Sequence, residues 1–155
     1  MNLFTYSHNN GEALVPPTTQ KRLYRVLREV KGTYKLKSAP KLRRTILDKL
    51  KEIGWTTEVP IALKPRVTIT SKNGDVGLCM QFGNMARFYA DLLKMQCFFE
   101  NGRITSGIYI IPTKSAAKAM ASNMVHYERV TKELELYKNI IDMPLLVIGV
   151  GGDLD

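Results

Sequence analysis

The chain has 155 residues, a length that fits one domain with a sizeable core. Its two cysteines are too few for a disulfide framework, no apolar run is long enough to span a bilayer, and the first residues do not resemble a secretory signal. We therefore expect a cytoplasmic, intracellular protein, and its net charge of +9 suggests an acidic partner.

The positive charge is concentrated between residues 21 and 51. This stretch has twelve Lys and Arg residues and two acids, which gives +10, while the remaining eleven basic and twelve acidic residues give −1. Apolar residues at helical spacing predict one helix from Thr18 or Thr19 to about Val30 and a second from Pro40 to Ile53. The block favours a nucleic-acid or other polyanion surface over a helix face that is charged only for solubility. The residues expected to contact phosphates are Lys21, Arg22, Arg25, Arg28, Lys41, Arg43 and Arg44.

The second half of the chain alternates strands and helices. Arg66–Ser71 and Val76–Phe82 have the pattern of paired strands, and Asn73-Gly74 between them is a strong signal for a two-residue turn. The further predicted elements are a helix from Asn84 to about Phe99, a strand at Ile104–Ile111, a helix from Ser115 to about Ile141 that breaks near Ser122-Asn123, and a strand at Leu145–Val150. Because the last two strands are strongly apolar, we expect them inside a sheet covered on both faces. The order of elements predicts a mixed α/β fold.

The hairpin is expected to place Thr70, Cys79 and Gln81 on one face, with Asp75 near its tip. The predicted turn pairs Lys72 with Asp75, so even positions of the first strand share a face with odd positions of the second. A hairpin that leads into a helix is a common frame for a metal-dependent nuclease site, where Mg²⁺ prefers carboxylate oxygens. Threonine offers a neutral oxygen, cysteine a soft ligand and glutamine no charge, so this face has the geometry of such a site but weak ligands.

Four further stretches carry a resemblance to a known family. They are YSHNNGEA (6–13), KSAPKLRRTILDKLKEIGW (37–55), TSKNGDVGLCMQFGN (70–84) and ADLLKMQCFFENGRITSGIYIIPTK (90–114). In this order, and continuing through MPLLVIGV, they resemble the BglII-type family of type II restriction endonucleases, which has the PD-(D/E)xK nuclease fold. The resemblance covers nearly the whole chain. It implies one restriction-endonuclease-like domain over residues 1–155, with a basic helical part at 18–55 and a nuclease-like core at 66–150.

The resemblance also implies where a metal site would lie. The family's motif is an Asp, a Glu nine residues later and a Gln two residues beyond, and these positions hold Thr70, Cys79 and Gln81. Both charged ligands are replaced, so restriction-endonuclease ancestry is implied while Mg²⁺-dependent cleavage is expected to be lost or much reduced. Mg²⁺ is the expected cofactor only if the chain is an active nuclease. Asn84 and Arg87 are expected to face a DNA groove, because Asn pairs with adenine edges and Arg with guanine.

Acids elsewhere in the chain offer a way to rebuild the site. The candidates are Glu12, Asp75 and Asp91, which come from three separate segments. Asp91 can instead form an ion pair with Lys94 or Arg87, Glu12 can serve a cap or a turn, and Asp75 lies four residues from Cys79, which is too far along the strand to replace a ligand directly. A working nuclease with a migrated metal site therefore stays open as a second hypothesis.

The cysteines and histidines give weaker signals. Cys79 could be a nucleophile or a Zn²⁺ ligand, but its possible partners, His8, Cys97 and His126, show none of the spacings typical of a Zn²⁺ site. A small buried side chain is the more common role for such a cysteine. We therefore expect no metal at these residues.

The combined prediction is a protein that binds double-stranded DNA and forms a symmetric homodimer. Family members of this kind act as two-fold dimers on palindromic sites, and a helix within 84–99 or 18–53 is expected to supply the interface. DNA binding would place the protein with the nucleoid in the cytoplasm. A third hypothesis is a dimerising or partner-binding remnant that does not bind DNA, in which the basic block serves only solubility.

Overall fold

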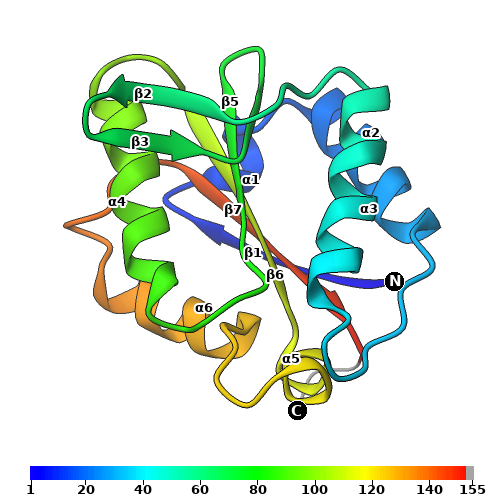
Figure 1. Cartoon of the computed structure of the whole chain (residues 1–155). Helices are drawn as coiled ribbons and strands as arrows, with labels where there is room; N and C mark the ends of the chain where they lie inside the picture. Colours follow the sequence, from blue (N-terminus) through cyan, green and yellow to red (C-terminus); the bar gives the residue numbers. More distant parts are fainter. Residues whose placement is uncertain (153–155) are drawn as a thin grey trace.

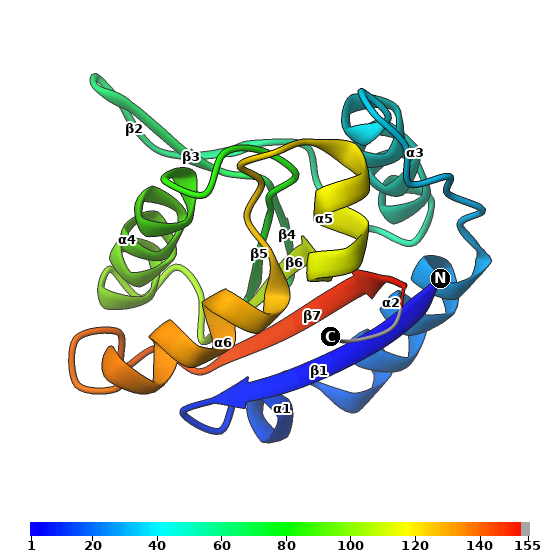
Figure 2. The ribbon, with the colours of Figure 1, turned by 90° about the horizontal axis from the view of Figure 1, so that it is seen from below.

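The structure, a computed structural model, describes residues 1–152 apart from the side chain of Leu63. Its centre is a five-stranded mixed sheet in the order β1-β7-β6-β5-β4 (Figures 1 and 2). These strands are β1 (Asn2–His8), β7 (Leu145–Gly151), β6 (Ser106–Pro112), β5 (Val76–Met80) and β4 (Ser71–Asn73). The three middle strands are parallel, and β1 and β4 run antiparallel to their neighbours at the two edges. A second sheet contains only β2 (Val59–Leu63) and β3 (Arg66–Ile69).

Within residues 1–152, six helices surround the central sheet. In chain order they are α1 (Gly11–Leu14), α2 (Pro17–Glu29), α3 (Ala39–Glu52), α4 (Arg87–Glu100), α5 (Lys114–Met120) and α6 (Tyr127–Leu136). Figure 1 shows α4 and α6 on one side of the strands and α2 and α3 on the other. The mixed sheet with helices on both sides confirms the mixed α/β fold expected from the order of elements.

The core forms where the sequence is most apolar. Every residue of β6 and β7 is buried, which confirms the prediction that these two strands lie inside the sheet. Glycines let the helices approach them closely, because a side chain at Gly107 would meet Met95 of α4 and one at Gly149 would meet Tyr127 of α6. The helices α2 and α3 turn their apolar stripes inward, which leaves their Lys and Arg residues on the outer surface.

Several predicted boundaries differ from the structure. The turn of the hairpin lies at Gly74-Asp75, with Asn73 paired to Val76, so the predicted turn at Asn73-Gly74 is wrong by one residue. Gly74 is the first residue of this turn and has a φ of 54°, a backbone conformation that favours glycine. The helix expected from Asn84 begins at Arg87, since residues 84–86 form a turn.

Two further differences arise from weak local patterns. The edge strand β1 and the strand β2 were not predicted, because β1 is only partly buried and β2 contains Pro60, which is tolerated in an edge strand. The last predicted helix is two helices, and the break near Ser122-Asn123 is confirmed by the extended segment between α5 and α6. Within residues 1–152, none of the helices is long and apolar enough to cross a membrane.

Candidate functional site

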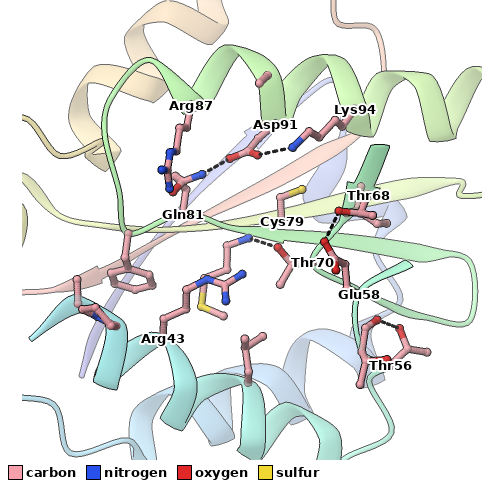
Figure 3. Close-up of a pocket in the computed structure, with 18 of the residues that line it drawn as sticks. Arg43, Thr56, Glu58, Thr68, Thr70, Cys79, Gln81, Arg87, Asp91 and Lys94 are labelled. Atoms are coloured by element: carbon pink, nitrogen blue, oxygen red, sulfur yellow. Dashed lines mark hydrogen bonds and ion pairs between the residues drawn. The ribbon is translucent and has the colours of Figure 1, made fainter. Parts of the chain in front are cut away.

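A cleft of about 730 Å³ opens between α3 and α4, where β5 ends. Its floor includes Thr70 and the residues from Cys79 to Phe82, and the loop before β2 closes one end. The cleft exists because β4 has three residues and pairs only with the first part of β5. The end of β5 therefore has no neighbouring strand on that side, and the two helices form the walls (Figure 3).

The structure brings Thr70, Cys79 and Gln81 together in this cleft. The shifted turn still pairs odd with even positions, since Ser71 lies opposite Leu78, and this keeps the three residues on the predicted side. Thr70 also has a structural contact, because its Oγ1 accepts a hydrogen bond of 3.1 Å from the backbone N–H of Met80. The Thr70 hydroxyl thus takes the place of the strand partner that the Met80 N–H would have if β4 were longer.

Cys79 is unsuited to bind a metal or act as a nucleophile in this structure. Its side chain is 2% exposed, and burial, followed by the negative charge of Asp91, raises the pKa of its thiol to about 12. A thiol with this pKa stays protonated near neutral pH, whereas nucleophilic attack needs the thiolate, and the burial of Cys79 leaves a metal ion little access to its sulfur.

The histidines and the other cysteine lie away from this thiol. His8 is buried beside Ile141, His126 caps α6 through Arg129, and Cys97 is exposed on α4. In the part of the chain that the structure describes, no group of three or more His, Cys, Asp or Glu residues is arranged to hold a metal ion.

Asp91 is the centre of a polar network on the wall formed by α4. Its Oδ2 accepts hydrogen bonds from Gln81 Nε2 at 2.8 Å and from the Tyr109 hydroxyl at 3.1 Å, and its Oδ1 lies 3.9 Å from Lys94 Nζ. Burial raises the pKa of Asp91, although these two hydrogen bonds and the charges of Lys94 and Arg87 act in the opposite direction. The predicted ion pair of Asp91 with Lys94 is therefore present.

The other two candidate acids lie outside the cleft. Glu12 is exposed on α1, where its backbone N–H bonds to Ser7, and Asp75 is exposed in the turn between β4 and β5. The structure therefore does not bring Glu12 or Asp75 to the metal position. It does bring Glu58, which the sequence did not single out, to the mouth of the cleft, where Glu58 accepts hydrogen bonds from Thr68 and Arg66.

Four cationic side chains line the cleft. Arg43 and Lys51 come from α3, and Arg87 and Lys94 come from α4 on the opposite wall. Of the residues predicted to bind DNA, Arg43 and Arg87 are the two that reach this cleft. The others lie elsewhere on the surface: Lys21, Arg22, Arg25 and Arg28 on α2, Lys41 and Arg44 on α3, and Asn84 in the turn before α4. Asn84 Oδ1 accepts a hydrogen bond of 2.8 Å from the backbone N–H of Ala86, which supports that turn.

Comparisons with known proteins identify this architecture. The fold is that of a restriction endonuclease: BglII complexed with a DNA 16-mer matches with a TM-score of 0.89, 15% sequence identity and coverage of 99% of this chain and 79% of that chain. Free BglII matches with a TM-score of 0.77, 18% identity and coverage of 99% and 81%. The family model for restriction endonuclease BglII/BglIII matches residues 3–150, so the chain belongs to this family, as its sequence predicted. The comparison with curated proteins gave no match.

The environment of the two cysteines predicts a difference in reactivity. In the folded protein near neutral pH, we expect Cys97 to react quickly with a chromogenic disulfide reagent and Cys79 to react very slowly, because Cys79 is buried and protonated. Absorbance should report one fast thiol in buffer and two in denaturant. The Cys97→Ser variant should lose the fast phase, and two fast thiols in the folded natural chain would contradict this description of the cleft.

Proposed function

We propose that the protein is a DNA-binding homologue of a type II restriction endonuclease whose Mg²⁺-dependent cleavage is lost or much reduced. One observation carries the proposal: the two positions assigned to charged metal ligands hold a neutral threonine and a buried, protonated cysteine. Thr70 and Cys79 face the cleft in the place where family resemblance puts the metal. Mg²⁺ is bound in proteins chiefly by carboxylate and phosphate oxygens and water, and neither Thr70 nor Cys79 supplies a carboxylate.

The remaining acids in the cleft are occupied by other partners. Both oxygens of Asp91 face donors or a cation from Gln81, Tyr109 and Lys94, and Glu58 is bonded to Thr68 and Arg66. A divalent ion would have to displace these contacts before either carboxylate could bind it. This arrangement supports a site that has kept its shape and lost its metal chemistry.

Duplex DNA is the partner that we propose for the cleft and the basic helices. BglII, whose fold this chain shares, has been solved with a DNA 16-mer. The cleft here has four cations and two acids among its lining residues, and the outer surfaces of α2 and α3 add the basic block. Neutralised phosphates release bound counterions, so such a surface gives affinity that is strong at low salt. A DNA partner implies a cytoplasmic location.

The proposal predicts a steep dependence of DNA affinity on salt. The combined Arg43→Gln and Arg87→Gln change should weaken binding to mixed-sequence duplexes and reduce the slope of log affinity against log salt by about two. Fluorescence anisotropy over a salt series measures both quantities. The matched control is Lys64→Gln with Lys72→Gln, two cations outside the cleft and outside α4 and α6. A natural chain without salt-dependent affinity would favour the remnant that does not bind DNA.

An active nuclease with a migrated site is the second candidate. The observation that favours it is the position of Asp91, the one acid of the three proposed substitutes that lines the cleft, with Glu58 at the same opening. In this alternative the two carboxylates would share a metal after DNA displaces Lys94. Cleavage by the natural chain that is lost in Asp91→Asn, with DNA binding retained, would establish this alternative over our proposal.

We also propose that the protein forms a homodimer through α4 and α6. Tyr89 and Leu93 are exposed on α4, and Leu136 and Ile140 are exposed at the end of α6 and just after it. The two helices are joined by a hydrogen bond of 2.8 Å from the Tyr89 hydroxyl to Glu133. The apolar stripes of α2 and α3 face the core instead, so the 84–99 region is the better supported of the two predicted interfaces. A two-fold dimer suits a palindromic DNA site.

A charge on the exposed face of α4 should separate this dimer. Leu93 is 64% exposed, and we expect Leu93→Glu to shift the protein from dimer to monomer, because it places two like charges near the proposed two-fold interface. Sedimentation velocity measures the change in mass. Leu36→Glu is the matched control, since Leu36 is 71% exposed and lies outside α4 and α6. Equal masses for the natural chain and Leu93→Glu would argue against this interface.

A further inference from the structure

We propose that Lys94 holds a DNA phosphate in the cleft without a metal ion, and that Asp91 is the residue that positions Lys94 for this contact. The inference rests on the proposed DNA-binding function and assigns a residue that the basic block, at 21–51, does not include. Lys94 would thus provide the positive charge at the place where family resemblance puts a metal.

The position of Lys94 is the first observation. Lys94 and Asp91 are three residues apart on α4, so both side chains lie on the same face of the helix. Figure 3 shows this face turned into the cleft, with the Lys94 side chain reaching toward Asp91 near Cys79. The charge of Lys94 is close enough to Cys79 to oppose the rise in the pKa of its thiol. Lys94 therefore lies beside one of the two positions that lost a charged ligand.

The geometry of Asp91 is the second observation. Two donors fix its Oδ2, Gln81 from the end of β5 and Tyr109 from β6, and this directs Oδ1 toward Lys94. Asp91 is only 7% exposed, so its carboxylate is held by these neighbours and not by solvent. A carboxylate fixed in this way attracts the Lys94 ammonium and keeps the long, flexible side chain over the cleft.

The distance between the two groups leaves Lys94 free to bind. Lys94 Nζ lies 3.9 Å from Asp91 Oδ1, which is longer than a hydrogen bond. An ammonium has three N–H donors, so electrostatic attraction to Asp91 does not use up its capacity to donate to phosphate oxygens. The side chain of Lys94 is 36% exposed, which keeps the ammonium accessible from the cleft.

The charge of the surrounding cleft favours an anion over a metal ion. Arg43, Lys51, Arg87 and Lys94 line it against Glu58 and Asp91, which leaves an excess of two positive charges. An excess of this sign attracts a phosphodiester and repels Mg²⁺. Arg87 and Arg43 line the cleft from opposite walls, so both can contact the same DNA backbone together with Lys94.

The test compares DNA affinity in EDTA and in excess Mg²⁺ at matched ionic strength, using the full chain and a mixed-sequence duplex. We expect the natural chain to bind in EDTA and to gain no affinity from Mg²⁺, which competes with its cations for the phosphates. Lys94→Gln should weaken binding about tenfold, the effect of losing one charge-assisted hydrogen bond, and reduce the salt slope by about one. Lys94→Arg should keep the slope of the natural chain, and Lys64→Gln, which removes an exposed charge outside the cleft and outside α4 and α6, should change neither quantity.

Asp91→Asn gives a second readout with a definite sign. The variant removes a negative charge from the cleft, so charge alone would strengthen DNA binding. Loss of the group that positions Lys94 would weaken it instead, and weaker binding is the result that we expect. Stronger binding by Asp91→Asn would show that Asp91 does not position Lys94.

The outcomes separate this inference from the proposed function. A natural chain that binds no DNA under any condition overturns both. A natural chain that binds DNA only with Mg²⁺ overturns the metal-free contact and leaves DNA binding intact, and this comparison needs no variant to fold. A Lys94→Gln variant that melts at the temperature of the natural chain and binds like Lys64→Gln also overturns the contact, because a purely structural ion pair would leave DNA affinity unchanged.

Discussion

The hydrogen bonds that reach Asp91 join the two parts of the molecule that form the cleft. Gln81 extends from the end of β5 and Tyr109 from the middle of β6, and both donate to the same carboxylate oxygen on α4. These bonds tie the helix to the sheet at the point where β5 loses its neighbouring strand. The orientation of α4, and with it the positions of Arg87 and Lys94, depends on this contact.

Thr70 and Cys79 fit the cleft without a metal ion. Thr70 bonds to the backbone N–H of Met80, and Cys79 packs as a small buried side chain, so neither substitution leaves an unpaired charge. Two carboxylates at these positions without a metal would repel each other in a partly buried site. Neutral residues remove that repulsion, which makes a stable cleft compatible with the loss of the metal.

The fold and part of the cleft could be predicted from the sequence. The predicted turn was wrong by one residue, but the prediction that Thr70, Cys79 and Gln81 share a face was not affected. Side chains alternate along strands, and the shifted turn still pairs odd with even positions. The roles of Tyr109 and Lys94 could not be predicted. Tyr109 meets Asp91 only because the parallel register places it beside Cys79, and Lys94 reaches the cleft only because α4 is rotated to face it. Both depend on packing between segments distant in sequence, which local patterns do not encode.

The distribution of basic residues shows the same limit. The composition located the block at 21–51, but in the structure only Arg43 and Lys51 of α3 line a wall of the cleft, and the basic residues of α2 lie on an outer surface. The opposite wall takes its cations from α4, where Arg87 and Lys94 are separated by a full turn and more of the helix. A cluster in space thus combines residues from two segments, and only one of them is rich in charge.

The central claim is that the fold and the DNA-binding cleft remain while the metal ligands are lost. The most direct test is a cleavage assay on mixed-sequence plasmid DNA, with Mg²⁺ and with Mn²⁺, that compares the natural chain with a variant carrying Thr70→Asp and Cys79→Glu. We predict that the natural chain leaves the plasmid intact and that the double variant cuts it. Cleavage by the natural chain would contradict the claim, and Asp91 and Glu58 would then be the residues to change next.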